Sequence, residues 1–332
     1  MKKILLLFVT LLSMSANVMA DGLTATLQQG ESMTPFYGVD AFKQAYEAAQ
    51  DGAVITLSSG KFNDVSSIDK SITIVGAYAF GANDPKTTVL TYTTVNADNV
   101  KIEGIYFSSD VTIGGVSNCH FKRSWVEGYL TSIDGTEHVN TLIDQCLIKY
   151  DKAIANGKNY CMKNCTIGGF LAMNTSENVA YITNCYVYDW YKYDVSSYKQ
   201  PYAIYKNNML QLNNNATNFD HTLYLYAPSE FYYNVFVRKN TNTSSHWVIY
   251  SFISGCINMG NATASYFHNG YITGMNDSSD GKTGQDGTPV GITGGTGFSE
   301  YPAIPRITSQ TIDSTTDSEG KLNVKVAVEV QK

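Results

Sequence analysis

The chain has 332 residues, of which 16 % are charged and 12 % are aromatic, and its formal net charge is −6. This acidic balance argues against nucleic acid as a partner, because binding to phosphates needs clustered Lys and Arg. The length allows one large domain or two smaller ones. The 24 tyrosines and the abundant Asn, Thr, Ser and Gly indicate a β-rich protein with many turns.

Residues 1–20 are predicted to be a secretory signal peptide. Two lysines precede an apolar run from Ile4 to Leu12, and the small residue Ala20 stands at the expected cleavage point. The run is much shorter than the roughly 20 residues that span a bilayer, so we expect no membrane span. Cleavage leaves 21 basic and 29 acidic side chains, a net charge of 21 − 29 = −8. We therefore expect a secreted, periplasmic or cell-surface protein.

A short pattern recurs downstream: an apolar residue, any residue, Asn or Gly, then a small or medium apolar residue. Its nine matches have a mean spacing of about 22 residues, which suits one coil of a solenoid. The third position holds Gly76, Gly104, Asn118, Gln145, Asn164, Asn184, Asn208, Asn234 and Gly255. Gly and Asn most readily adopt the left-handed conformation, so we predict a sharp turn at this position of each coil.

Two matches deviate from the pattern. Gln145 is neither Gly nor Asn, so its coil is expected to turn differently. The interval from Ile105 to Cys119 is only 14 residues, which indicates that one early match is misplaced.

The stretch "GVDAFKQAYEAAQDGAVITLSSGKF" predicts a helix followed by strand, turn and strand. The apolar face of the helix consists of Phe42, Ala45, Tyr46 and Ala49. Gly52 follows as a stop signal. Together with the repeat, this stretch resembles the right-handed parallel β-helix of the pectate-lyase-like superfamily over residues 35–295. The resemblance implies that the helix caps the open end of the first coil.

The C-terminal segments "DGTPVGITGG", "PAIPRITSQTI" and "SEGKLNVKVAVEV" are similar to the ends of uncharacterised secreted bacterial β-helix proteins. "LNVKVAVEV" alternates strictly and "DSEGK" is a turn, so residues 306–330 should form two antiparallel strands. The expected organisation is a signal peptide at 1–20 and an all-β, right-handed parallel β-helix with a helical cap at 21–300. A hairpin at 301–332 is expected to pack on the last coils.

Six cysteines in an exported chain suggest disulfides as a first interpretation. Five of them follow the turn position, namely Cys119, Cys146, Cys165, Cys185 and Cys256. Side chains stacked on adjacent coils lie roughly 4.8 Å apart, against the roughly 3.8 Å between Cβ atoms that a bridge prefers, so bridging is disfavoured but not excluded. Met209 and Val235 continue the same column. We therefore predict a stack of buried free thiols. Cys161 and Cys165, spaced C-x3-C without a nearby His, are weak evidence for zinc.

Catalytic candidates come from positions just after this column. Lyases of the superfamily use a carboxylate cluster for Ca²⁺ and an Arg or Lys base, and its hydrolases use closely spaced Asp residues. Neither pattern is present. Asp151 and Asp189, with Lys152 or Arg123, remain weak candidates that could converge on adjacent coils; the alternative is that they are solvated loop charges.

The segment "YVYDWYKYDVSSYKQPYAIY" at 186–205 contains seven Tyr and one Trp. Aromatic rings at a groove can stack on sugar rings, and their hydroxyl or N–H groups can form hydrogen bonds. The predicted carbohydrate-binding residues are Tyr188, Asp189, Trp190, Tyr191 and Tyr193. The alternative is that about half of these rings pack into the core or beneath a loop.

The sequence therefore favours a non-catalytic protein that binds polysaccharide or another surface glycan. A uronic-acid lyase or hydrolase is the alternative, and a structural or adhesion protein is a further one. We expect no metal and no cofactor. Residues 276–287 are rich in Asp and Gly but lack the ligand order of a Ca²⁺ loop, so they indicate Ca²⁺ only weakly.

Overall fold

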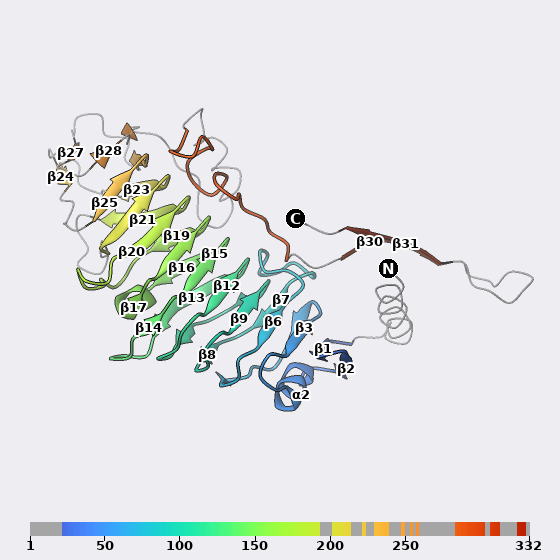
Figure 1. The fold of residues 1–332 in the computed structure, drawn as a ribbon. Coiled ribbons are helices and arrows are strands. Elements are labelled where there is room, and N and C mark those ends of the chain that lie inside the picture. The colour runs from blue at the N-terminus through green and yellow to red at the C-terminus, as the bar shows by residue number, and fades with distance from the viewer. Residues whose placement is uncertain are drawn as a thin grey trace, which may run out of the picture.

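The computed structural model describes residues 22–192, 201–213, 221–223, 229–238, 247–249, 253–254, 257–258, 283–302, 306–312 and 324–329. The chain winds into a parallel β-helix whose coils stack along one axis (Figure 1). The predicted signal peptide lies outside the described residues.

The first sheet has 12 strands among the described residues, in the order β2-β1-β3-β6-β9-β12-β15-β18-β20-β22-β25-β28. Its strands are β1 (Thr24–Gln29), β2 (Ser32–Tyr37), β3 (Val54–Leu57), β6 (Thr73–Val75), β9 (Lys101–Glu103), β12 (His120–Lys122), β15 (Leu142–Asp144), β18 (Cys161–Lys163), β20 (Ala180–Thr183), β22 (Ala203–Lys206), β25 (Glu230–Tyr232) and β28 (Ile253–Ser254). From β3 onward each strand pairs in parallel with the next coil.

The second sheet has 13 described strands and supplies the other faces of each coil. They are β4 (Gly60–Lys61), β5 (Ser67–Ile68), β7 (Thr88–Leu90), β8 (Thr93–Val95), β10 (Tyr106–Phe107), β11 (Val111–Ile113), β13 (Trp125–Ser132), β16 (Leu147–Asp151), β19 (Thr166–Gly169), β21 (Tyr186–Lys192), β23 (Met209–Asn213), β26 (Val235–Arg238) and β29 (Ile257–Asn258). Three small pairs complete the described strands: β14 (His138–Val139) with β17 (Gly157–Lys158), β24 (His221–Leu223) with β27 (Trp247–Ile249), and β30 (Arg306–Ile312) with β31 (Val324–Glu329).

The core runs along the inside of the coils, because equivalent inward positions stack from one coil to the next. In the first sheet this column contains Ile55, Ile74, Ile102, Phe121, Ile143, Met162, Ile182, Tyr205 and Phe231. Each is at most 2 % exposed. Burying one such side chain contributes about 1.5–3 kcal/mol, so the stacked column holds neighbouring coils together.

The N-terminal cap is confirmed as a helix, α2 (Ala41–Ala48), with Phe42, Ala45 and Tyr46 buried. Lys70 Nζ donates to the carbonyl oxygens of Tyr46 at 2.7 Å and Ala49 at 2.9 Å, which satisfies acceptors at the end of the helix. The antiparallel strands β1 and β2 extend the first sheet beyond β3. This hairpin was not expected from the sequence.

The turns that leave the first sheet adopt the left-handed conformation that the repeat predicts. Their residues are Gly104, Arg123, Gln145, Asn164, Asn184, Asn207 and Tyr233, with φ between 46° and 70°. Gln145 has φ 56°, so the expectation that its coil turns differently was wrong. In two coils the turn falls one residue before the predicted Asn208 and Asn234.

Gly76 is not left-handed; a Cβ there would lie 2.4 Å from the carbonyl oxygen of Gly104, so close approach of the next coil requires the glycine. Gly255 lies outside the described residues.

A second turn, which leads into the first sheet, explains the misplaced match. Asn99, Asn118, Asn140 and Asn159 have φ between 52° and 60°. Their side chains form a ladder in which each Nδ2 donates to the Oδ1 of the preceding coil at 3.0–3.1 Å. Asn118 therefore belongs to this ladder, and Arg123 occupies the turn position to which the sequence had assigned Asn118.

Free thiols are confirmed at every described cysteine. The backbone N–H of Cys146 donates to Cys165 Sγ at 3.4 Å, and that of Cys165 donates to Cys185 Sγ at 3.4 Å. In the next coil the N–H of Cys185 donates to Asn208 Oδ1 at 2.8 Å. In the coil after that, the N–H of Asn208 donates to Asn234 Oδ1 at 2.9 Å. The column thus continues through Asn208 and Asn234, and the expectation that Met209 and Val235 fill it was wrong. The thiols accept hydrogen bonds that hold successive coils in register.

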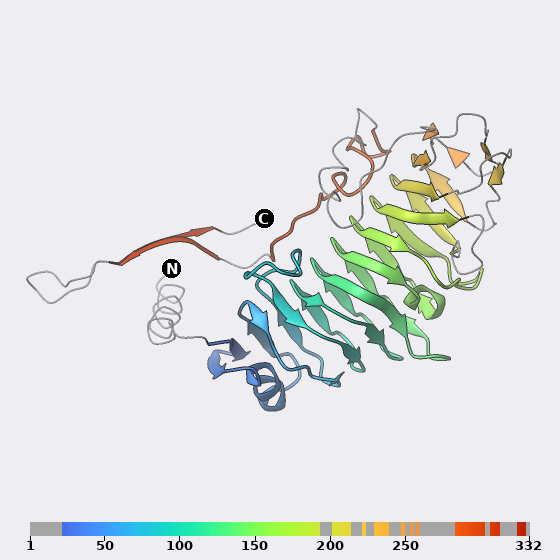
Figure 2. The same ribbon diagram turned by 180° about the vertical axis from the view of Figure 1, so that it is seen from behind.

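Residues 283–302 form a C-terminal strap that runs back along the coils (Figure 2). Gln285 N donates to Asn207 Oδ1 at 2.8 Å near the start of the strap. At its other end, Pro302 lies so close to Gly104 that a Cβ at Gly104 would be 2.4 Å from the proline ring.

The strands β30 and β31 are antiparallel, as predicted. Because the strap returns to the coil of Gly104 before β30 begins, the pair is placed near the early coils rather than on the last coils. Both views show the pair projecting from the solenoid (Figures 1 and 2).

Candidate functional site

One line of positions on the second sheet leads from two tyrosines on earlier coils to Asp189, which the sequence selected. Tyr129 pairs with Tyr150, and Gly169 pairs with Asp189. Asp151 bridges Phe170, which places Tyr150 beside Gly169. The line therefore crosses four successive coils, with roughly 4.8 Å between neighbours.

An aromatic pair lies on this line, in which Tyr129 is exposed and Tyr150 is half-buried. The rings of Tyr129 and Tyr150 have centroids 5.8 Å apart and are inclined by 31°. Tyr129 is 37 % exposed, and Lys152 Nζ lies 4.0 Å from its ring centroid. Lys149 Nζ, on the same strand as Tyr150, forms an ion pair of 2.8 Å with Glu127 Oε1. Two aromatic rings, with the Lys152 ammonium group over the ring of Tyr129, thus form one surface patch.

The strands are irregular along this line. Between Val126 and Tyr129, β13 carries one residue more than β16. Between Val187 and Tyr191, β21 carries two residues more than β23, so residues 188–190 form a bulge. Bulges bend a strand and change the direction of its side chains, and they are common beside binding sites.

The predicted carbohydrate-binding residues occupy this second bulge and the strand that follows it. Tyr188 is half-buried and packs at 6.3 Å, edge to face, on Tyr186. The backbone of Asp189, Trp190 and Tyr191 belongs to β21, but their side chains lie outside what the structure describes. The same holds for all of Tyr193.

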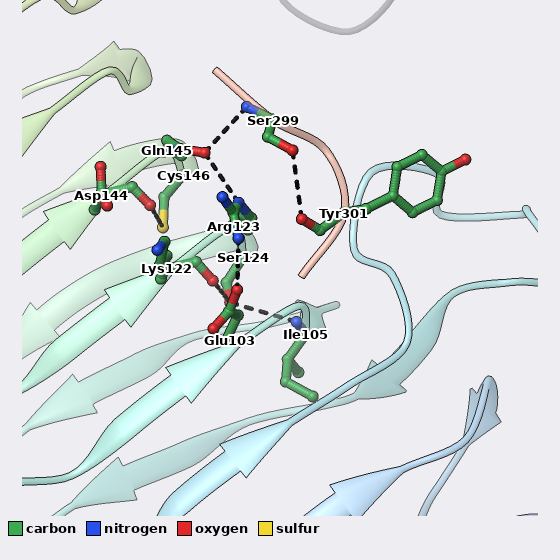
Figure 3. Close-up of polar contacts among 10 residues, drawn as sticks. All are labelled: Glu103, Ile105, Lys122, Arg123, Ser124, Asp144, Gln145, Cys146, Ser299 and Tyr301. Carbon is green, nitrogen blue, oxygen red and sulfur yellow. Dashed lines mark hydrogen bonds and ion pairs between the residues drawn. The ribbon is translucent and has the colours of Figure 1, made fainter. Parts of the chain in front are cut away.

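Arg123 is only 3 % exposed and links three coils (Figure 3). Its Nη1 forms an ion pair of 2.9 Å with Glu103 Oε1, and its Nε donates to Gln145 Oε1 at 3.0 Å. The strap closes over this network, since Ser299 N donates to the same Gln145 oxygen at 3.0 Å. The guanidinium therefore holds coils and strap together.

Asp151, the last residue of β16, points into the core, whereas Lys152, the N-cap of the helix that follows, holds its ammonium group over the Tyr129 ring. Asp151 is fully buried: Tyr160 Oη donates to its Oδ2 at 2.9 Å, and Ile154 N donates to its Oδ1 at 3.2 Å. Ile154 belongs to the short 3₁₀ helix η1 (Ala153–Asn156), so the carboxyl group holds this turn. Burial raises the pKa of Asp151 to about 7, although the hydrogen bond from Tyr160 lowers it.

A buried histidine packs beside this carboxyl group. His138 contacts the Tyr160 ring edge to face at 5.7 Å. Its Nε2 lies 2.9 Å from the Ala153 carbonyl oxygen, which can only accept, so Nε2 carries the proton. Burial lowers the pKa of His138, which keeps the ring neutral.

The structure thus does not assemble the four catalytic candidates. Arg123 is engaged beneath the strap, Asp151 is in the core, Lys152 is on the outer face, and only Asp189 shares the line with Tyr150. The sequence did not point to Tyr129, because the turn of its coil was assigned to Asn118 rather than Arg123, and because the extra residue in β13 shifts Tyr129 by one position from the spacing of Tyr150.

No group of three or more His, Cys, Asp or Glu side chains that could hold a metal occurs in the described part of the chain. Residues 276–282 of the weakly indicated Ca²⁺ segment lie outside that part. Among the described helices, none has the length and apolar character needed to cross a membrane.

Comparison with known proteins found no match to a protein family, a curated protein or a solved structure.

Proposed function

We propose that this chain binds an extended glycan along the outer face of the second sheet and does not cleave it. We also propose that the chain is exported by its signal peptide and is related to the pectate-lyase-like superfamily. A parallel β-helix with a helical cap over its first coil supports that relationship.

The Tyr129–Tyr150 pair, in which Tyr129 is exposed and Tyr150 is half-buried, is the observation that carries the proposal. Aromatic faces stack on the apolar faces of sugar rings, while hydroxyl groups at the ring edge bond to sugar hydroxyls. Because the coils repeat every roughly 4.8 Å, the line extends from these rings toward Asp189 and the bulge of β21. A linear array of this kind suits a linear polymer better than a compact ligand.

The contacts of the candidate residues favour binding over catalysis. Inverting glycoside hydrolysis needs two carboxyl groups that face one another across the scissile bond, and a retaining mechanism also needs two. Asp151 lies inside the solenoid, bonded to Tyr160, so it cannot face a polymer on the outer surface where Asp189 has its strand. Arg123, as a base for a lyase, would first have to leave Glu103 and Gln145.

The test uses the mature full chain against three neutral polysaccharides, xylan, hydroxyethylcellulose and galactomannan, and two acidic ones, polygalacturonate and alginate. Affinity electrophoresis measures retention, and assays of reducing and unsaturated ends measure cleavage. We expect retention by at least one polysaccharide without new chain ends. Replacing both Tyr129 and Tyr150 by Ala should weaken retention at least tenfold.

The matched control is Tyr181→Ala, since Tyr181 is 46 % exposed but belongs to β20 of the first sheet. New chain ends that disappear in Asp189→Asn would instead support the lyase or hydrolase. Failure of all five polysaccharides to retard the chain would contradict glycan binding and favour the adhesion role.

A further inference from the structure

The C-terminal strap contacts the proposed binding face through two apolar clusters on the outside of the second sheet. The first outer cluster consists of Tyr78, Ala79, Phe80, Tyr106, Trp125 and Leu147. The second outer cluster consists of Tyr186, Met209, Val235, Val290 and Ile292, the last two from the strap. Phe298 of the strap and Tyr188 of β21 each pack against both clusters, so they join the strap to the sheet.

Tyr188 is also the first residue of the bulge in β21. Val187 still pairs with Leu210, and regular pairing resumes only at Tyr191, which pairs with Leu212. Within the bulge the three residues 188–190 face only Gln211 of β23, and on the other side Asp189 pairs with Gly169 of β19, so packing of side chains supplies part of the restraint on the backbone. The described packing of Tyr188 is on Tyr186 and on the two clusters that the strap completes.

The strap is anchored to the solenoid both before Phe298 and at Phe298 itself. Asn164 Nδ2 donates to the carbonyl oxygens of Ile292 at 3.0 Å and Gly294 at 2.6 Å. Further along, the Phe298 ring lies edge to face on Phe80 with centroids 5.1 Å apart. Held by Asn164 before Phe298 and by Phe80 at Phe298, the strap can keep this ring in place against the clusters that Tyr188 contacts.

We propose that the strap controls the conformation of the glycan-binding face, and that Phe298 is a positioning residue that acts through Tyr188 on the bulge at 188–190. This inference rests on the proposed function only for its effect on affinity. Loss of the Phe298 ring loosens the two clusters against which Tyr188 packs, and the bulge then samples backbone conformations that do not match the ligand. Binding weakens because part of the interaction energy must reorder the strand.

The test compares Phe298→Ala with Tyr301→Ala in the full chain. Tyr301 is the matched control because it is a strap residue whose ring centroid lies 5.0 Å from that of Tyr78 and which packs against the first outer cluster but not the second. Hydrogen exchange, read by mass spectrometry on the peptide that covers 186–192, needs no ligand. We expect faster exchange there in Phe298→Ala, unchanged exchange in Tyr301→Ala, and recovery in Phe298→Leu.

Affinity is then measured for each of the five polysaccharides named above. We expect Phe298→Ala to bind on the order of tenfold more weakly than the unchanged chain, which corresponds to about 1.4 kcal/mol. The affinity of Tyr301→Ala should stay within about twofold of that of the unchanged chain. Exchange in 186–192 that is as slow in Phe298→Ala as in the unchanged chain would overturn the inference. If no polysaccharide binds the unchanged chain, glycan binding fails, while the exchange measurement still decides whether the strap positions the bulge.

Discussion

Replacing Asp151 by Asn should remove a pH-dependent loss of stability from the folded chain. The carboxyl group is fully buried, and burial raises its pKa from an ordinary 3.8 to about 7, with Tyr160 and Ile154 donating to it. The folded state therefore binds the proton more tightly than the unfolded state does. The stabilisation that the folded chain gains from this tighter proton binding is complete below about pH 4 and is lost as the pH rises to about 7.

The size of the effect follows from the shift. A difference of about 3 pKa units corresponds to about 4 kcal/mol, at 1.36 kcal/mol per unit. Asn resembles the protonated acid in shape and charge, so the Asp151→Asn chain does not lose this free energy as the pH rises. The substitution still costs about 1 kcal/mol, because the amide offers one acceptor oxygen where the carboxylate offers two.

Urea unfolding of both chains at pH 4, 5, 6, 7 and 8 measures the difference directly, since all other titrating groups are shared. The free energy of unfolding of Asp151→Asn, relative to the unchanged chain, should rise by about 1.4 kcal/mol per pH unit between pH 4 and pH 7 and then level off. A difference that stays constant across this range would refute the reasoning, because it would mean that Asp151 titrates alike in both states.

Two further predictions concern the turns. Asn164→Gly keeps a residue that tolerates φ of 50° but loses the amide that donates to Ile292 and Gly294. It should therefore lower the free energy of unfolding, measured by thermal unfolding, by about 1–3 kcal/mol. Unchanged stability would show that these bonds do not secure the strap. Cys146 and Cys185 are fully buried, and burial raises the pKa of their thiols, so iodoacetamide should label them only after unfolding. Labelling of the folded chain would contradict burial, and an unfolded chain that is labelled only after a reductant is added would contradict free thiols.

The coil and its cap could be predicted because each depends on local patterns. Phe42, Ala45 and Tyr46 recur at helical spacing, and Asn164 and Asn184 mark turns that their own side-chain chemistry favours. These features depend on short stretches of sequence, so the residues of a single coil predict its turn, and the same pattern recurs in neighbouring coils.

The repeat pattern mispredicted a turn whose conformation is stabilised by side chains of neighbouring coils rather than by its own residue type. Arg123 adopts φ of 46° although its type rarely does, and its bonds to Glu103 and Gln145 offset the cost. Since the sequence gives no sign of these partners, the nearby Asn118 was taken for the turn.

The strap could not be predicted either. It has no strand or helix period, and its anchors contact residues far away in the sequence, as Ser299 contacts Gln145. For the candidate site, Asp189 could be selected because it follows the correctly assigned turn at Asn184, whereas assigning the turn of an earlier coil to Asn118 pointed to Arg123 instead of Tyr129.

Hydroxyl-radical footprinting of the full chain, with and without the polysaccharide that it retains, tests glycan binding on the second sheet most directly. Oxidation is read at each tyrosine by mass spectrometry. We predict that the ligand slows oxidation of Tyr129 and Tyr150 and leaves Tyr181 on the first sheet unchanged. Equal protection of all three, or protection of Tyr181 alone, would contradict the account.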